Sequence, residues 1–201
     1  MKHTLFAIAL AASPLLAAEE GFVPLFDGKT LDGWKVSENP DSFSVKDGAI
    51  VAFGPRAHAF YVGKDGEAKF EDFELRLEVM TKENSNGGVF FHAAYQEKGW
   101  PIKQGYEVQV NNTHSDWRKS GGLYAIVDNK EPFKDDEWMQ YVIRVEDGVV
   151  NVTIDGKEVV KDFKPEGEQD KLVEGGGLIA LQAHDPGSTV FYKNIRIKKL
   201  D

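Results

Sequence analysis

Polar and apolar side chains alternate along residues 105–111, which read Gly-Tyr-Glu-Val-Gln-Val-Asn. This period of two predicts a β-strand whose Tyr and Val side chains face a core, so the polar side chains share the opposite face. They are Glu107, Gln109 and Asn111. One carboxylate and two amides supply directional donors and acceptors that suit sugar hydroxyls and carbonyls. A solvent-exposed strand face is the alternative interpretation.

A second strand is predicted for residues 177–184, Gly-Leu-Ile-Ala-Leu-Gln-Ala-His. Gln182 and His184 share one face of this strand, and the aliphatic side chains of Ile179 and Leu181 share the other. A histidine at the end of an apolar strand usually has a structural role. If it shares a sheet face with a strand-borne glutamate, however, it becomes a candidate for the active site.

The residue types exclude some chemistries more firmly than others. Ordinary glycoside hydrolysis needs two carboxylates about 5 to 10 Å apart, and the first strand supplies only Glu107. A metallohydrolase needs a cluster of His or Asp ligands, for which His114 and Asp116 on one polar loop offer a weak basis. We therefore expect no cofactor and predict no metal site.

Short strand patterns separated by Gly, Asn and Asp turns follow one another through the chain. The clearest cover residues 72–80, 138–145, 149–154 and 190–200. In the last of them, Phe191, Ile195 and Ile197 are expected to share one face. About ten or more such strands without crossover helices predict one all-β domain, an antiparallel two-sheet β-sandwich.

Residues 1–18 have the composition of a secretory signal peptide. Lys2 stands near its start, an apolar run follows, and Ala17 and Ala18 precede two acidic residues. We therefore expect a mature domain over residues 19–201 that is exported to the periplasm or secreted. The chain contains no Cys, so we expect a soluble protein without disulfides and without the N-terminal Cys that a bacterial lipid anchor needs.

The charge of the chain limits its partners. The formal net charge is −9, with 24 Lys and Arg against 33 Asp and Glu. Nucleic-acid binding needs clustered positive charge, which the sequence lacks. No stretch after the signal is long and apolar enough to cross a membrane. We expect a small carbohydrate as the partner, no nucleic acid and no membrane, and the sequence leaves the oligomeric state open.

Several blocks of the mature chain resemble, in order, those of the 3-keto-disaccharide hydrolase domain family. They cover residues 25–34 (Leu-Phe-Asp-Gly-Lys-Thr-Leu-Asp-Gly-Trp), 72–78, 86–92, 105–109, 122–124, 137–138, 177–184 and 191–200. The resemblance implies a concanavalin-like jelly roll whose concave sheet holds the sugar site. It also implies that the strands around residues 107 and 182 lie in the same sheet. One departure is His92, which stands where an Arg is common.

The resemblance further implies an enzyme that cleaves glycosides whose C3 hydroxyl is already oxidised to a ketone. Such a ketone acidifies the C2 hydrogen, so one base can form an enolate that expels the C1 oxygen, with or without later addition of water. The candidate catalytic residues are Glu107 and His184, and either can be the base. The candidate substrate-binding residues are Asn86, His92, Gln109, Asn111, Trp117, Tyr124 and Gln182.

A non-catalytic, lectin-like carbohydrate-binding module is the alternative function. Jelly-roll domains bind sugars with amides and aromatic rings alone, and the same fold carries many functions. Trp100, Trp117 and Tyr124 would then be stacking platforms. Two of them, Trp100 and Trp117, lie on long loops of the kind that border binding sites.

Overall fold

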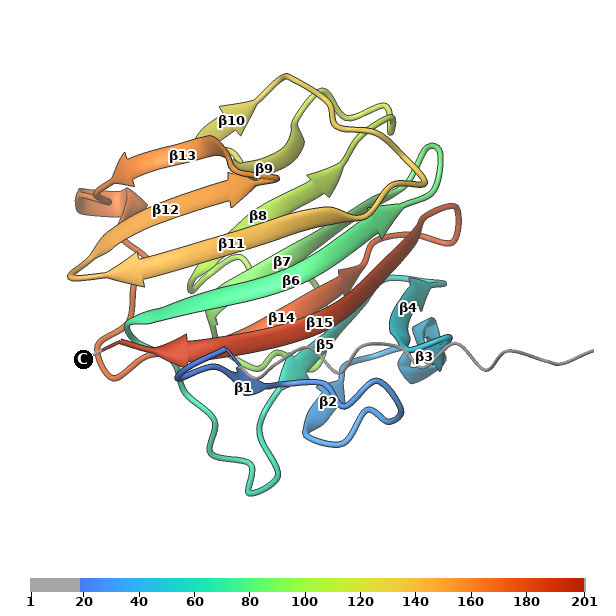
Figure 1. The fold of residues 1–201 in the computed structure, drawn as a ribbon, viewed down its shortest axis with the longest axis horizontal. Helices are drawn as coiled ribbons and strands as arrows, with labels where there is room; N and C mark the ends of the chain where they lie inside the picture. The colour runs from blue at the N-terminus through green and yellow to red at the C-terminus, as the bar shows by residue number, and fades with distance from the viewer. Residues whose placement is uncertain (1–18, 201) are drawn as a thin grey trace, which may run out of the picture.

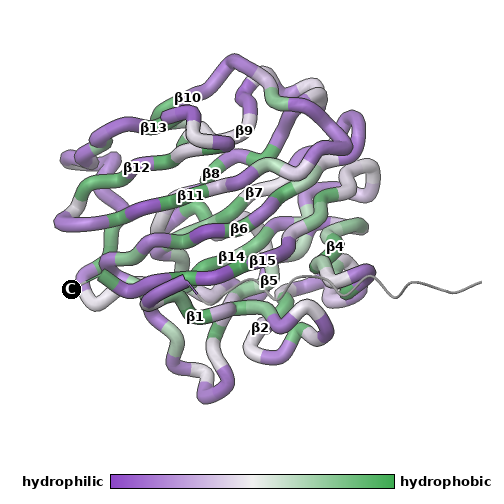
Figure 2. The backbone as a smooth tube through the Cα atoms, viewed as in Figure 1, coloured by the Kyte–Doolittle hydropathy of each residue, from purple (hydrophilic) through white to green (hydrophobic). Residues whose placement is uncertain are grey.

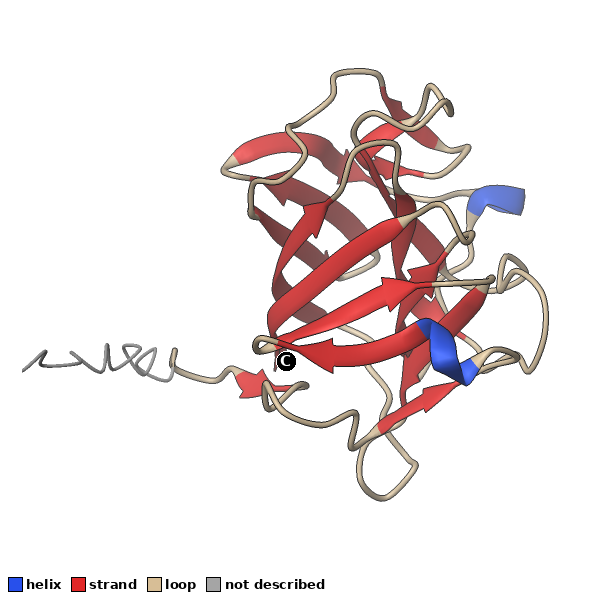
Figure 3. Cartoon of the chain, turned by 90° about the vertical axis from the view of Figure 1, so that its right-hand side faces the viewer, coloured by secondary structure: helices blue, strands red, loops and turns tan. Residues whose placement is uncertain are grey.

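The computed structural model describes residues 19–200 as two antiparallel sheets packed face to face (Figure 1, and Figure 3 from the side). The first sheet has the order β13 (Lys157–Phe163), β12 (Val149–Ile154), β11 (Met139–Glu146), β6 (Phe73–Thr81), β15 (Thr189–Lys199), β4 (Ala49–Phe53) and β3 (Phe43–Lys46), and β1 (Val23–Pro24) pairs with β15. The second sheet has the order β10 (Val127–Asn129), β9 (Lys119–Leu123), β8 (Tyr106–Asn111), β7 (Asn86–Ala93), β14 (Leu178–Ala183), β5 (Ala57–Tyr61) and β2 (Trp34–Val36). Helical structure within residues 19–200 consists of two short 3-10 turns, Pro40–Ser42 and Gly167–Gln169. The predicted jelly-roll sandwich is confirmed.

Strand β6 shows why the chain forms this sandwich. Leu75 and Leu77 are at most 1 % exposed and pack between the sheets, whereas Glu74 and Arg76 alternate with them on the outer face. Figure 2 shows the same alternation of hydrophobic and hydrophilic residues along the neighbouring strands. Each strand can bury one face only against another sheet, so the period of two leads to a two-layer sandwich.

The second sheet brings together the polar side chains of β8 (Glu107 and Gln109) and those at the end of β14 (Gln182 and His184). Val108 and Val110 of β8 and Ile179 and Leu181 of β14 point into the core between the sheets. The two strands lie in one sheet with β7 between them, as the family resemblance implied. Because side chains alternate, the polar residues of both strands lie on the face of this sheet that is turned away from the core.

A bulge in β15 changes the predicted face of one residue. The register with β6 shifts between Lys193 and Arg196, and Asn194 adopts a left-handed φ of 50°. The extra residue reverses the parity, so Tyr192 points into the core together with Ile195. The prediction that Phe191 shares a face with Ile195 was therefore wrong, and Phe191 is only half-buried.

Within residues 19–200, no helix is long and apolar enough to cross a membrane. The predicted signal peptide, residues 1–18, lies outside the described residues, so export stays a prediction. The predicted mature domain is described except for residue 201.

Candidate active site

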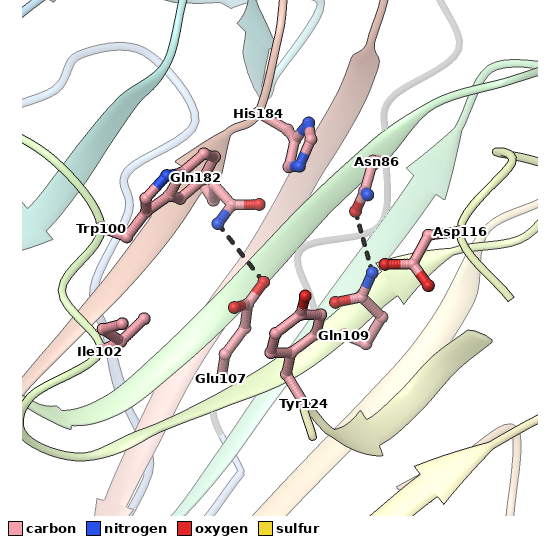
Figure 4. A pocket seen from close by; sticks show the side chains of 9 residues that line it. All are labelled: Asn86, Trp100, Ile102, Glu107, Gln109, Asp116, Tyr124, Gln182 and His184. Carbon is pink, nitrogen blue, oxygen red and sulfur yellow. Dashed lines mark hydrogen bonds between the residues drawn. The ribbon is translucent and has the colours of Figure 1, made fainter. Parts of the chain in front are cut away.

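A pocket of about 230 Å³ lies on the outer face of the second sheet (Figure 4). It is lined by Asn86, Trp100, Ile102, Glu107, Gln109, Asp116, Tyr124, Gln182 and His184. Both candidate catalytic residues and four of the candidate substrate-binding residues thus come together. They do so because β7, β8 and β14 are adjacent and present the same face.

Glu107 is a half-buried acid in the floor of the pocket. The pKa of Glu107 is raised to about 8, mainly by burial of its carboxyl group and to a smaller extent by the negative charge of Asp116. A hydrogen bond from Gln182 Nε2 to Glu107 Oε1, 3.3 Å long, opposes this shift only in part. At neutral pH the carboxyl group therefore carries its proton for most of the time and can donate it.

The neighbouring strand makes room for this carboxyl group at Gly88. A Cβ atom at this position would lie 2.5 Å from Glu107 Oε1 and 2.9 Å from its Cγ. The side chain of Glu107 therefore reaches over the neighbouring strand β7, into space that the side chain of any other residue at position 88 would fill. The second glycine of the Asn-Gly-Gly sequence at the start of β7 thus leaves the space that the Glu107 side chain occupies.

His184 is held by the residue that follows it. Its Nδ1 lies 2.7 Å from Asp185 Oδ2, and the ring is partly exposed to the pocket. Burial of the Asp185 carboxyl group opposes ionisation, but hydrogen bonds from His184, Ser188 and Gly187 outweigh this effect and lower its pKa. An ionised Asp185 requires the proton of the neutral imidazole to be on Nδ1, which leaves Nε2 as a proton acceptor.

Two side-chain carbonyl groups in the pocket wall have no hydrogen-bond donor among the described residues. Gln109 Nε2 donates to Asn86 Oδ1 at 2.9 Å, and Gln182 Nε2 donates to Glu107. These bonds orient the amides, and the Oε1 atoms of Gln109 and Gln182 remain buried without a hydrogen bond from residues 19–200. A buried acceptor without a donor costs about 1–3 kcal/mol.

Trp100 forms one side of the pocket and covers a histidine. Its ring centre lies 5.2 Å from that of His184 and 5.9 Å from that of His58. His58 is fully buried, and burial lowers its pKa to about 4, so it is neutral at physiological pH. Sequence reasoning missed His58 and the roles of Asp185 and Ile102. The adjacent His-Asp pair was the signal available for Asp185.

His92 does not line the pocket, contrary to its prediction as a substrate-binding residue. It adopts a left-handed φ of 53°, and the register of β7 with β14 shifts beside it. Its Nδ1 accepts a hydrogen bond from the backbone N–H of Val173 at 3.0 Å, and its Nε2 lies 2.9 Å from the backbone oxygen of Glu71. Both ring nitrogens are therefore used within the fold, and burial lowers the pKa of His92.

Asn111 and Trp117 are also placed outside the pocket lining. The Asn111 amide lies on the expected face, but it donates to the backbone oxygens of Asp116 and Arg118 and so holds the loop after β8. Trp117 is 48 % exposed, and the guanidinium of Arg118 lies 4.6 Å from its ring centre. The loop turns this tryptophan away and presents Asp116 instead.

His114 and Asp116, the weak basis for a metal site in the sequence, gain no further metal ligand within residues 19–200. His114 Nδ1 accepts a hydrogen bond from the backbone N–H of Asp116 at 3.2 Å. In the part of the chain that the structure describes, no group of three or more His, Asp or Glu side chains is placed to hold a metal ion.

Known proteins resemble this chain in sequence and in fold. A 3-keto-disaccharide hydrolase from Bacteroides thetaiotaomicron is 29 % identical over 90 % of this chain and 79 % of its own length. The crystal structure of a candidate glycosyl hydrolase from Parabacteroides distasonis aligns with a TM-score of 0.74 at 22 % identity, over 90 % of this chain and 95 % of that one. A carbohydrate-binding module from Bacillus subtilis aligns with a TM-score of 0.59 at 14 % identity, over 85 % and 98 % of the two chains. The model of the family described as 3-keto-alpha-glucoside-1,2-lyase-like domain matches residues 21–198, and the chain belongs to that family.

Proposed function

We propose that the protein cleaves the glycosidic bond of 3-keto-glycosides, including 3-keto-disaccharides, by eliminating the C1 substituent. Its family membership and its relative named as a 3-keto-disaccharide hydrolase support the class of reaction. The observation that carries the mechanism is the pairing, in one pocket, of a protonated Glu107 with a histidine held by Asp185. The pocket thus offers one acid and one base.

The proposed reaction requires no second carboxylate. A base removes the C2 proton, and the electron pair of that C–H bond forms an enolate with the C3 ketone. The enolate returns its electrons to form a C1–C2 double bond as the C1–O bond breaks, and the departing alcohol takes up a proton. Addition of water to the unsaturated ketone would make the net reaction a hydrolysis, whereas release of that ketone would make it a lyase reaction.

We assign the base to His184 and the acid to Glu107. In the neutral form of the His184 ring, Nε2 is the free acceptor, because Nδ1–H donates to Asp185 Oδ2. Glu107 is protonated at neutral pH, so it is suited to donate to the C1 oxygen as that oxygen leaves. The opposite assignment would need an ionised Glu107, for which its buried carboxyl group is poorly placed.

The amides of the pocket would hold the sugar ring. The carbonyl groups of Gln109 and Gln182 accept hydrogen bonds from its hydroxyls, and Asn86 fixes the orientation of Gln109. Trp100 and Tyr124 supply flat surfaces on which a sugar ring can stack. These contacts position C2 near the base, which is where much of the rate enhancement of a single-base reaction arises.

The second candidate is a carbohydrate-binding module without catalysis. The fold similarity to the Bacillus subtilis module favours it, as do the amides and aromatic rings of the pocket. A module of this kind would have no need of a strongly perturbed acid beside an oriented histidine.

One comparison of substrates separates these functions. The protein is expected to release free sugar from a 3-keto-disaccharide and to release none from the same disaccharide with an intact C3 hydroxyl. The measurement is product formation by chromatography after incubation with each form. Release from both forms would indicate an ordinary glycosidase. Binding of either form without release would indicate a binding module.

Gly88→Ala is expected to lower kcat on the 3-keto substrate by about tenfold or more, because the added methyl group displaces the carboxyl group of Glu107. Gly87→Ala on the same strand is the matched control. Its Cβ would point to the core side, 3.0 Å from Tyr192 Oη and 3.1 Å from Val190 Cγ2, so it should lower Tm with little effect on kcat. Equal kcat values for the two variants would contradict the role of Gly88.

A further inference from the structure

Two turns that cross from one sheet to the other meet beside the pocket, one between β14 and β15 and one between β6 and β7. A reciprocal pair of hydrogen bonds joins them. The backbone N–H of Asn86 donates to Ser188 Oγ at 2.9 Å, and that of Thr189 donates to Ser85 Oγ at 2.8 Å. Both serines are buried. As acceptors, Ser188 and Ser85 therefore have equivalent roles in joining the two turns.

Ser188 makes one further contact, which reaches the proposed base. Its hydroxyl group donates to Asp185 Oδ2 at 2.8 Å, and the same oxygen lies 2.7 Å from His184 Nδ1. The other carboxylate oxygen of Asp185 accepts the backbone N–H of Gly187 at 2.8 Å. Burial of this carboxyl group opposes its ionisation, and the Ser188 hydrogen bond is among those that outweigh burial and lower its pKa. Ser188 thus holds the carboxylate oxygen that faces the imidazole.

We infer that Ser188 is a positioning residue for the base: it fixes Asp185 so that the His184 ring keeps its proton on Nδ1 and turns Nε2 to the pocket. This inference rests on the proposed function. Ser188 is buried and is not among the described residues that line the pocket, so it acts through Asp185 and does not touch the substrate. Its bond to Asn86, the residue that orients Gln109, gives the base and a sugar-binding amide a common support.

Ser188→Ala is expected to lower kcat on a 3-keto-glycoside by about tenfold or more, with a smaller change in KM, because a less well oriented base acts mainly on the transition state. Ser85→Ala is the matched control. It removes the equivalent hydrogen bond between the turns without removing the contact to Asp185, so it should lower Tm by a similar amount and keep kcat near the wild-type value. Equal losses of kcat in the two variants would assign Ser188 to the fold alone and overturn the inference.

The tautomer of His184 provides a readout that does not depend on turnover. In nitrogen NMR spectra of protein with isotope-labelled histidine, the His184 signals are those that His184→Ala removes. At a pH where the ring is neutral, we expect the proton on Nδ1 in the wild type and a larger share on Nε2 in Ser188→Ala. Ser85→Ala should give the wild-type signals. An unchanged His184 tautomer in Ser188→Ala would overturn the inference.

A double mutant tests whether Ser188 acts through Asp185. Asp185→Asn keeps a side-chain oxygen for the N–H of Gly187, but its amide nitrogen cannot accept the Ser188 proton. Adding Ser188→Ala to Asp185→Asn should therefore lower kcat by much less than Ser188→Ala does in the wild type, since residues that act through one contact are not additive. Additive losses of kcat would contradict a role through Asp185.

The outcomes separate this inference from the proposed function. If the wild type cleaves a 3-keto-disaccharide but Ser188→Ala and Ser85→Ala have equal kcat, the inference fails and the proposed function stands. If the wild type cleaves no 3-keto-glycoside, the proposed function fails. The NMR measurement then still decides whether Ser188 orients the His184 ring.

Discussion

Replacing His184 with alanine is expected to lower kcat on a 3-keto-glycoside by on the order of a hundred to ten thousand fold, while KM changes little. A base acts mainly in the transition state, so its loss affects the rate far more than binding. The ring lies in the pocket with Nδ1 bound to Asp185, which leaves only Nε2 to take the C2 proton. The measurement is steady-state kinetics of the purified variant.

The matched control for this variant is His114→Ala. The ring centre of His114 lies 5.8 Å from that of His184, but its Nδ1 accepts a hydrogen bond from the backbone of Asp116. We expect kcat of this control to stay within about tenfold of the wild type.

Removal of the C2 proton by His184 also predicts an isotope effect in the wild-type protein. Deuterium at C2 should slow turnover severalfold if proton removal limits the rate. A kcat of His184→Ala within about tenfold of the wild type, with no exchange of the C2 hydrogen with solvent, would show that His184 is not the base.

Glu107→Gln is expected to lower kcat by a similar factor, on the order of a hundred to ten thousand fold, because glutamine cannot donate a proton to the leaving oxygen. The pH dependence of kcat/KM in the wild-type protein should show whether Glu107 acts as the acid or as the base. The pKa of Glu107 is about 8, so a general acid is active below that value and kcat/KM falls as the pH rises through it. If Glu107 were the base, kcat/KM would rise toward pH 8 instead.

The stability of this variant provides a readout independent of activity. The folded protein keeps the Glu107 proton up to about pH 8, whereas the unfolded chain loses it near pH 4.5, the ordinary pKa of a glutamate. The folded state therefore binds more protons between these values, and wild-type stability falls as the pH rises through this range. The variant lacks this titration.

Its Tm relative to the wild type should therefore increase between pH 5 and pH 9, by an amount equivalent to on the order of a few kcal/mol of unfolding free energy. Thermal unfolding at several pH values measures this difference. A constant difference in Tm would mean that the carboxyl group is not strongly perturbed. Leu77→Ala in the core, which removes no titrating group, is a control whose loss of stability should not depend on pH.

The carboxyl group of Glu107 in the floor of the pocket costs the folded protein stability. A glutamate in this position destabilises the folded protein at high pH, and a neutral residue would avoid that cost. The strand opposite also carries Gly88, a residue that is weak in strands, where its missing Cβ leaves space for the acid. Sites that sacrifice stability in this way are commonly functional.

The alternation of the sequence was enough to predict the sandwich and the two polar rows. Glu107, Gln109, Gln182 and His184 lie on one face because the strand period leaves no other arrangement when the apolar residues are buried. The family resemblance added that the two strands share a sheet. The prediction failed where the period breaks, at the bulges beside Asn194 and His92, since one extra residue reverses every later side chain.

The sequence by itself therefore determined the fold class and which strand faces carry hydrogen-bonding groups, because both follow from local periodicity. Only the tertiary structure decided which of these groups are free to act. Asn111 and His92 have suitable chemistry, but backbone atoms distant in sequence or on a folded loop use their hydrogen bonds. The proposed roles of acid and base likewise depend on long-range burial of Glu107 and on the orientation of His184 by Asp185. A pKa depends on the surroundings of a group in space, which the order of residues does not show.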